Sequence, residues 1–242
     1  MGKLPTFLAI IPAREGTKRL PGKNIKKLLK KPLIQWTIDA ALQSQYINNT
    51  IVSTDNDAVI KITQETKGIK ALERPASLAS DTARMVDVVK HALENSMLKY
   101  DYVVLLQPTS PLRTGIHIDQ AIELLIEKKA DAVISVCEMK HSPLWSNTLP
   151  VNNSMAGFLR REIINKSSQE LEKYYRLNGA IYICKTDIFL NENTFMVQKN
   201  SFAYIMPSRQ SIDIDDDLDL TLAEIIMKET VFRSNKQRRN EG

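Results

Sequence analysis

The feature that most restricts the fold is a short apolar run that ends in a cationic loop. Residues 7–11 are all apolar, Pro12 interrupts the run, and residues 14–24 then contain two glycines and four cations. An apolar run of this length followed by turn residues predicts a buried strand that feeds a loop. In α/β folds such a loop lies at the carboxyl edge of the sheet, where ligands bind.

This loop has the chemistry of a phosphate site. Gly16 and Gly22 let the backbone approach a ligand closely, and backbone N–H groups together with cationic side chains can surround an anion. Residues 14–31 hold eight Lys/Arg and one Glu, a net charge of +7. The loop has neither the Gly-x-x-x-x-Gly-Lys-Ser/Thr nor the Gly-x-Gly-x-x-Gly pattern. A solvated basic loop is the alternative interpretation, but the buried strand before it favours phosphate binding.

The following residues alternate between helix and strand patterns. After the strand at 7–11, a helix is predicted from Pro32 to Ser44 and a second strand over 49–53. A second helix follows over 58–66 and a third strand over 69–72. This alternation predicts βαβ units and a mainly parallel sheet. Further helices are predicted over 82–97 and after Gly115. Further strands are predicted over 102–106, 132–137, 181–184 and 203–207.

The charge distribution points to a small anionic ligand. The chain of 242 residues carries +5, of which the 14–31 segment contributes +7 and the tail 233–242 contributes +3, so the remainder carries −5. A nucleic-acid-binding protein more often spreads its basic residues over a whole face. We therefore expect no nucleic acid as a partner.

Cysteine usage and hydropathy indicate the compartment. Cys137 and Cys184 lie within apolar runs, which predicts buried free thiols in a reducing compartment. No apolar run approaches the roughly 18 residues of a membrane span. We therefore expect a cytoplasmic protein with no membrane association.

An acidic cluster near the end of the chain predicts a metal site. Alternation in an extended segment puts Asp213 and Asp215 on one side, where two carboxylates repel unless a cation lies between them. Hard oxygen ligands of this kind suit Mg²⁺ that is shared with a triphosphate. Asp216, Asp217 and Asp219 are instead expected to begin a helix through Lys228, because acidic residues favour a first turn.

The segment 139–176 differs from the rest of the chain. Its periodicity is weak, and apolar residues such as Trp145 and Phe158 alternate with polar ones. A segment of this length without regular structure is unusual in a compact monomer, so we expect an arm that packs on a partner surface. A flexible surface excursion is the alternative.

Five segments, in order along residues 6–229, resemble the motifs of the CMP-sialic acid synthetases (acylneuraminate cytidylyltransferases). They are residues 11–24, 74–83, 107–113, 176–180 and 211–215. Enzymes of this family join CTP to a nine-carbon 2-keto sugar acid of the sialic, legionaminic or pseudaminic type and release pyrophosphate. The resemblance implies a Rossmann-like three-layer α/β sandwich of the nucleotide-diphospho-sugar transferase type, with a mainly parallel mixed sheet. It also implies a homodimer in which the 139–176 arm helps to complete the partner's sugar site.

The resemblance also assigns residues to roles. Nucleotide binding is implied for Ala13, Arg14, Gly16, Thr17, Lys18, Lys23, Asn24, Arg74, Ala83 and Met85. Sugar binding is implied for Gln107, Arg176 and Asn178, and catalysis for Lys18, Lys23, Asp213 and Asp215, with Mg²⁺ on the two aspartates. Met85 departs from the family pattern, where a hydroxyl residue is usual.

Two alternatives remain at this point. Residues 19–23 also resemble the synthetases that activate Kdo, an eight-carbon acid, and a non-catalytic nucleotide-binding domain would keep the same fold. In either case we expect one nucleotidyltransferase domain over 1–232 and a disordered basic tail over 233–242.

Overall fold

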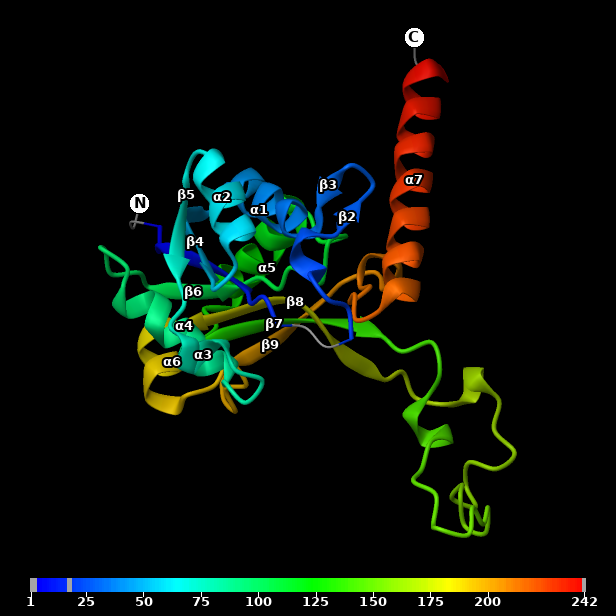
Figure 1. Ribbon diagram of the computed structural model, residues 1–242. Helices are drawn as coiled ribbons and strands as arrows, with labels where there is room; N and C mark the ends of the chain where they lie inside the picture. Colours follow the sequence, from blue (N-terminus) through cyan, green and yellow to red (C-terminus); the bar gives the residue numbers. More distant parts are fainter. Residues whose placement is uncertain (1–3, 17–18, 241–242) are drawn as a thin grey trace.

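The chain folds into a seven-stranded mixed sheet with helices on both faces (Figure 1). The computed structural model describes residues 4–16 and 19–240, the last ten by backbone alone. The strands are β1 (Phe7–Ala13), β4 (Ile47–Thr54), β5 (Ile69–Glu73), β6 (Tyr102–Leu105), β7 (Ala132–Glu138), β8 (Tyr175–Lys185) and β9 (Ser201–Ile205), in the order β5-β4-β1-β6-β8-β7-β9. A two-stranded ribbon, β2 (Lys27–Leu28) and β3 (Lys31–Pro32), lies beside the sheet.

The sheet is mainly parallel, as the sequence predicts. β1 pairs in parallel with β4 and β6, β4 with β5, and β7 with β9, whereas β8 runs antiparallel to both β6 and β7. Asn178 and Gly179 lie inside β8, which begins earlier than the strand predicted over 181–184. Here the pairing with β7 slips between Ile134 and Val136 and leaves a bulge.

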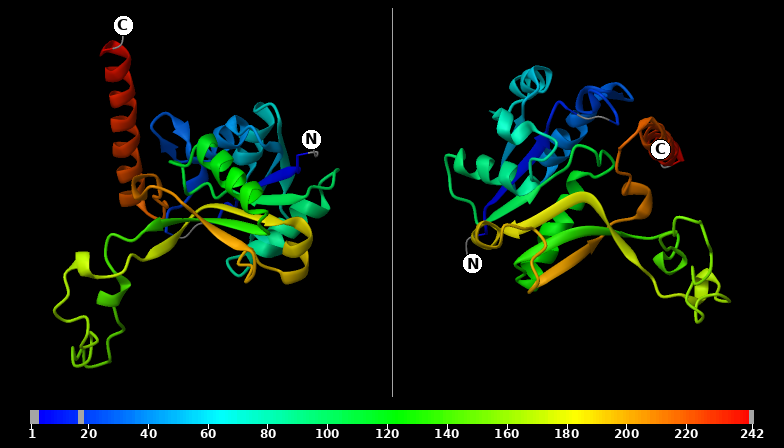
Figure 2. Two further views of the ribbon diagram at one scale, coloured as in Figure 1. Left: turned by 180° about the vertical axis from the view of Figure 1, so that it is seen from behind. Right: turned by 60° about the horizontal axis from the view of Figure 1, so that its bottom comes forward.

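Helices cover the two faces in separate sets. The helices are α1 (Leu33–Gln43), α2 (Asp57–Glu65), α3 (Ala76–Ala79), α4 (Met85–Glu94), α5 (Gly115–Lys128), α6 (Thr186–Glu192) and α7 (Asp217–Asn240). Short 3₁₀ turns are η1 (Lys23–Ile25), η2 (Pro143–Trp145), η3 (Ser168–Glu170) and η4 (Ser208–Gln210). α1, α2 and α5 pack on one face, and α4 and α6 on the other. The expected three-layer α/β sandwich is therefore confirmed (Figure 2).

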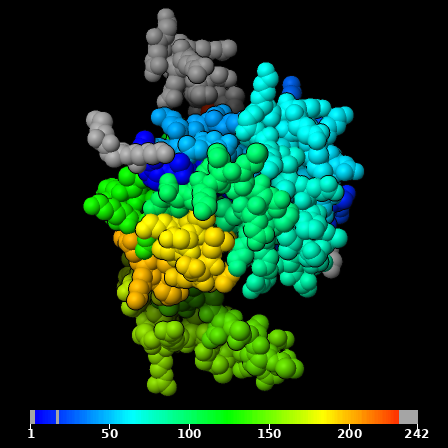
Figure 3. Space-filling view, turned by 90° about the vertical axis from the view of Figure 1, so that its left-hand side faces the viewer, coloured from blue at the N-terminus to red at the C-terminus, as the bar shows by residue number. Residues whose placement is uncertain are grey.

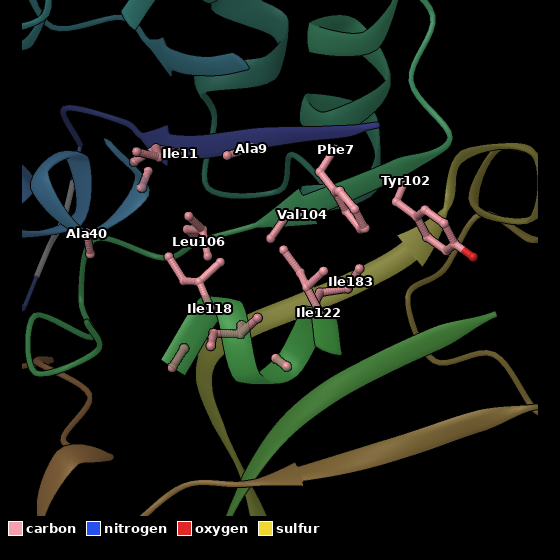
Figure 4. Packing of buried hydrophobic residues seen from close by; sticks show 14 of the residues in the cluster. Phe7, Ala9, Ile11, Ala40, Tyr102, Val104, Leu106, Ile118, Ile122 and Ile183 are labelled. Carbon is pink, nitrogen blue, oxygen red and sulfur yellow. The ribbon is translucent and has the colours of Figure 1, made fainter. Parts of the chain in front are cut away.

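Alternate residues of the central strands supply the two cores. Phe7, Ala9 and Ile11 of β1 point toward α5, as does Val104 of β6 (Figure 4). Leu8 and Ile10 point to the opposite face, toward α4 and α6. Because both faces of β1 are buried, the strand reads as a continuous apolar run rather than an alternating one.

Two segments extend beyond this body. The arm between β7 and β8 projects away from the sheet (Figure 3), and α7 projects from the same end in another direction. α7 continues to Asn240, so the prediction of a disordered tail from residue 233 is wrong for residues 233–240. That stretch contains no Gly or Pro and is rich in Arg, Lys and Gln, which favour helix.

Among the described residues, none of the helices combines the length and the apolar character that crossing a membrane requires.

Candidate functional site

The candidate site lies at the carboxyl ends of the central strands. From β1 the chain continues to β4 on one side, and β6 is added later on the other side, so the strand order reverses at β1. Ligands in open α/β sheets bind at such a switch point. The 14–24 loop follows β1, the 107–113 segment follows β6, and the 74–84 segment follows β5.

The loop after β1 is held by its own backbone and by Asn24. The Asn24 side chain is buried and donates from Nδ2 to the carbonyl of Arg14 at 2.9 Å. Gly22 has φ +65°, a conformation that glycine adopts without steric cost. Gly16 needs no such freedom in this structure, since its surroundings are open and its φ is not positive. Thr17 and Lys18, both assigned to nucleotide binding, lie outside the described residues.

Lys23 joins this loop to the acidic segment. Its Nζ donates to the carbonyl of Ile214 at 2.8 Å and lies 3.3 Å from Oδ1 of Asp215. Nη1 of Arg19 lies 3.3 Å from the other oxygen of Asp215. The Lys23 side chain is only 11% exposed, so its position is set by packing as well as by charge. The cationic loop and the acidic segment, separated by about 190 residues of chain, thus meet in space.

Of the two carboxylates in the acidic pair, that of Asp213 is less exposed to solvent than that of Asp215. Burial raises its pKa, and the charge of Asp215 raises it further. A hydrogen bond from the hydroxyl of Thr109 and the charges of Lys23 and Arg176 act in the opposite direction. The same segment is anchored by the Ile214 N–H, which donates to the Thr109 carbonyl at 2.8 Å. The charge of Asp215 therefore acts on the carboxylate of Asp213.

The donor set of this pair fits a divalent cation. One partly buried carboxylate with a raised pKa and one half-exposed carboxylate give hard oxygen ligands of the kind that a divalent cation prefers. No group of three or more His, Cys, Asp or Glu side chains within the described ranges 4–16 and 19–230 could form a cage for a metal ion. A cation bound here would therefore need oxygens from a ligand to complete its coordination.

The neighbouring aspartates begin α7, as expected. Asp216 accepts from the Asp219 N–H at 3.0 Å, and the Asp219 carboxylate accepts from the N–H groups of Asp215 and Asp216. This reciprocal arrangement caps the first turn of the helix. It also holds the backbone of Asp215 in place from the far side.

Gln107 and Gly179 lie together beside Asp213. A Cβ on Gly179 would come within 3.3 Å of the Gln107 Oε1 and within 3.6 Å of the Asp213 Oδ2. The Gln107 side chain thus lies against the β8 bulge, and Gly179 leaves the space for it. The hydroxyl of Thr109 lies 3.5 Å from the same Oε1.

The two remaining sugar-site candidates differ. Arg176 is exposed and donates to the carbonyls of Leu177 and Ser211, and its charge reaches Asp213. Asn178 is only 1% exposed, and its amide bonds to Ser135, Ser211, Met206 and the Ala180 N–H. Its hydrogen-bonding capacity is used inside the protein, so the structure opposes the expected contact between Asn178 and the sugar.

On the other side of β1, two arginines face acidic groups. Nη1 of Arg14 lies 2.7 Å from Asp81. Arg74 is buried, and its Nε and Nη2 donate to the hydroxyl and carbonyl of Ser53. Burial lowers the pKa of Arg74, and the carboxylate of Asp55 partly opposes this effect. Arg74 thus supports the ends of β4 and β5 from inside, which leaves Nη1 without an acceptor among the described residues.

The other nucleotide-site candidates contribute in different ways. Ala13 is buried and its carbonyl accepts from the Thr54 hydroxyl at 2.6 Å, so only its backbone can serve a ligand. Ala83 is half-buried and precedes α4, and Met85, the first residue of that helix, is 38% exposed.

Sequence reasoning missed Thr109, Asp55 and Asp81. Thr109 holds Asp213, Asp55 accepts from the Glu15 N–H at 2.9 Å, and Asp81 pairs with Arg14. Each follows the end of a strand or lies within a motif, which is the signal that could have found them.

A three-layer α/β domain with a cationic loop and an acidic pair at its switch point has the architecture of a nucleotide-binding protein. The comparisons with known proteins agree. A family model described as "Cytidylyltransferase" matches residues 8–237. The chain belongs to this cytidylyltransferase family.

Three relatives refine the assignment. The chain is 36% identical over 233 residues to an N-acylneuraminate cytidylyltransferase of Escherichia coli O18:K1:H7, covering 96% of this chain and 54% of that protein. It is 34% identical to a CMP-N,N'-diacetyllegionaminic acid synthase of Legionella pneumophila, covering 92% and 96% of the two chains. It is 31% identical to a pseudaminic acid cytidylyltransferase of Campylobacter jejuni, covering 91% and 96%. The chain thus spans about half the length of the E. coli relative and nearly all of the other two.

Solved structures support the fold. A CMP:2-keto-3-deoxy-manno-octonic acid synthetase complexed with CTP superposes with a TM-score of 0.71 at 18% identity, covering 93% of this chain and 99% of that one. A 4-diphosphocytidyl-2C-methyl-D-erythritol synthase of Anaerococcus prevotii gives a TM-score of 0.65 at 12% identity, with the same coverage.

Proposed function

We propose that this protein transfers the cytidylyl group of CTP to a nine-carbon 2-keto sugar acid. The observation that carries the proposal is the contact of Lys23 with Ile214 and Asp215, which brings the cationic 14–24 loop and the acidic pair to one place. The names of the relatives, which cover sialic, legionaminic and pseudaminic acids, support this substrate class.

In this proposal the triphosphate lies in the 14–24 loop. Arg14, Lys23 and Lys18 offset its charge, and Ala13, Gly16, Thr17 and Asn24 provide or support the backbone that surrounds it. The base is framed by Arg74, which follows β5, and by Ala83 and Met85 at the start of α4. Because Met85 has no hydroxyl, its contact with the base is apolar.

Gln107 and Arg176 face the sugar acid from the opposite side. Gln107 provides an amide for a sugar hydroxyl or acyl group, and Arg176 provides a cation for the carboxylate. Asn178 supports them indirectly, because it fixes the start of the β8 bulge.

Asp213 and Asp215 would hold Mg²⁺. When bound, the ion would neutralise phosphate charge and polarise the α-phosphorus. The chain's own residues hold this arrangement: Thr109 bonds to the Asp213 carboxylate, Asp219 accepts from the backbone N–H of Asp215, and Lys23 keeps the 14–24 loop against the acidic segment.

The reaction is a substitution at the α-phosphorus. The anomeric hydroxyl oxygen of the sugar acid forms the new P–O bond and its proton passes to solvent water. The bond to the β-phosphate oxygen breaks, and pyrophosphate leaves with that electron pair. The site promotes this step mainly by positioning and by charge stabilisation.

The arm supports a homodimer. Leu149, Val151, Met155 and Ile164 are all more than half exposed in the single chain. Apolar residues gathered on a projecting segment favour burial against a second copy. Sedimentation equilibrium should give twice the mass of the chain, and a monomeric mass at micromolar concentration would contradict this part of the proposal.

The decisive experiment measures pyrophosphate release with CTP, Mg²⁺ and one acid at a time: N-acetylneuraminic, legionaminic, pseudaminic and Kdo. We expect release with a nine-carbon acid. Release with Kdo alone would favour the eight-carbon alternative, and CTP binding without release with any acid would favour a non-catalytic domain.

A further inference from the structure

A cavity of about 270 Å³ lies apart from the candidate site. It is lined by α1, the β2–β3 ribbon, the 111–114 segment, η4 and the middle of α7, and it is open to solvent on one side. Of the described residues assigned above to the nucleotide, the sugar or the metal, none lines it. Its volume is close to the lower end of the range of about 300–1,000 Å³ for small-molecule pockets.

The wall of this cavity is mainly apolar. Leu29, Trp36, Leu112 and Ile226 contribute, from four different elements. Trp36 is fixed by a hydrogen bond from Nε1 to the Leu28 carbonyl, at 3.2 Å. Nζ of Lys31 lies over this ring, 4.7 Å from its centroid, and the aliphatic side chains complete the wall. Such a wall suits an apolar group that carries a negative charge.

One cation in the wall has no counter-charge among the residues that the structure describes. Arg113 is 1% exposed, and its Nε and Nη1 have no hydrogen-bond partner among the described residues. Only Nη2 is engaged, with the Thr37 hydroxyl at 2.7 Å and the Gln107 carbonyl at 3.4 Å. Burial lowers the pKa of Arg113 to about 9, and no carboxylate in the described part of the chain offsets this effect.

The acid that lines the same cavity does not neutralise Arg113. Asp39 pairs with Lys31 at 2.6 Å and accepts from Gln35 at 2.8 Å. The wall therefore keeps one uncompensated positive charge beneath an apolar surface. An unpaired buried cation is costly, so an anion that enters the cavity gains from it even without direct contact.

We propose that this cavity binds a small amphipathic anion, an aromatic carboxylate or its close equivalent. Its apolar body packs against Trp36 and Ile226, and its charge is offset by Arg113. Because Arg113 also holds the backbone of Gln107, such a ligand acts on the segment that faces the sugar acid. The cavity is therefore a second site, separate from that of the nucleotide.

The test uses 1-anilinonaphthalene-8-sulfonate, an aromatic monoanion, and its uncharged analogue N-phenyl-1-naphthylamine. In a Trp145→Phe background Trp36 is the one remaining tryptophan of the chain's two, so energy transfer from it reports the cavity. We expect one sulfonate per chain, quenching of Trp36, and no displacement by CTP. In Arg113→Met the sulfonate should bind at least fivefold more weakly, while the affinity of the neutral probe changes less than twofold.

A pair of helix variants checks the location. Thr230→Phe places a ring at the cavity, whereas Thr221→Phe makes the same change on the same helix away from it. Both threonines are exposed and bond only to the carbonyl four residues earlier. We expect at least tenfold weaker sulfonate binding in the first variant and no change in the second.

Three results would overturn the proposal: equal effects of the two helix variants, displacement of the sulfonate by CTP, or equal weakening of both probes in Arg113→Met. If Arg113→Met does not fold, the charge preference is judged in the parent protein. There the sulfonate must bind at least as tightly as the more apolar neutral probe.

Discussion

Gly179 offers the sharpest test of how the sugar side of the site is built. It has φ +75°, and an added Cβ would meet Gln107 Oε1 at 3.3 Å and Asp213 Oδ2 at 3.6 Å. Gly179→Ala therefore introduces two separate effects. One is backbone strain, and the other is crowding of a residue proposed to contact the sugar.

The strain can be estimated from the conformation. A left-handed conformation costs a residue with a Cβ about 1–2 kcal/mol, which in a chain of this size lowers Tm by about 2–8 °C. The crowding acts on function. At 3.3 Å the Gln107 amide must move by a few tenths of an ångström. Weakening one substrate hydrogen bond, worth about 0.5–1.5 kcal/mol, would raise the KM of the sugar acid about two- to tenfold.

Gly68→Ala is the matched control. Gly68 has φ +85°, and its nearest neighbour is the terminal Leu42 Cδ2 at 3.4 Å, on a half-exposed side chain that can move away. Thermal unfolding and pyrophosphate release should be measured for both variants. Both should lose a similar amount of Tm, but only Gly179→Ala should raise the KM of the sugar acid, with the KM of CTP within about twofold of the parent value.

Two results would refute this reasoning. A parent-like KM of the sugar acid in Gly179→Ala would show that Gln107 is not positioned against the bulge for substrate. An equal rise in Gly68→Ala would show that general loss of stability, rather than local crowding, changes KM.

Four other predictions concern the metal pair, the bulge, the buried cation and the thiols. Asp215→Asn should lower kcat by about 10²-fold or more while part of the CTP binding survives. Asp217→Asn, at the start of α7, is the control and should leave the rate nearly unchanged. Unaltered turnover in Asp215→Asn would refute the metal assignment. Asn178→Ala should lower the free energy of unfolding by about 2–4 kcal/mol, because the buried partners of Asn178 lose their hydrogen bonds; thermal unfolding measures this loss. A parent-like Tm together with a raised KM of the sugar acid would show that Asn178 contacts the sugar after all. Arg113→Met should keep or raise Tm at pH 7, since it removes a desolvated cation, and a large loss of Tm would contradict this. Burial raises the pKa of the Cys184 thiol to about 12, and both cysteines are buried. A thiol reagent at pH 8 should therefore react only after the protein unfolds, and rapid reaction of the native protein would refute this prediction.

The sequence was most informative where the cause of a structure is local. The burial of β1 on both faces gives an uninterrupted apolar run, and the aspartates at the start of α7 act through bonds to residues three or four positions away. The helix start and the strand-to-loop transition could therefore be predicted from neighbouring residues alone.

Side-chain roles were less predictable where the partners are distant in sequence. Asn178 lies in a motif and so was assigned to the sugar, but its amide is occupied by Ser135 and Ser211, 43 and 33 residues away. Arg74 is likewise engaged by Ser53, which lies 21 residues earlier. A motif identifies which residue types gather at a site. Whether a polar side chain in it contacts the ligand depends on whether other residues of the protein already occupy its hydrogen-bonding groups.

The central contact of the site shows how the two kinds of information combine. Lys23 and Asp215 were each predicted to act on the triphosphate, but for separate reasons: one from a cationic loop, the other from alternating carboxylates. They lie 192 residues apart, and no local pattern relates them. What relates them is the sheet: β1 and β6 end side by side, and the loop after β6 carries Thr109, which binds the segment of Asp213 and Ile214. The strand order explains only half of this meeting, because it places the loops after β1 and β6 side by side. The acidic segment follows β9 at the edge of the sheet, and its hydrogen bond to Thr109 is what brings it to those two loops.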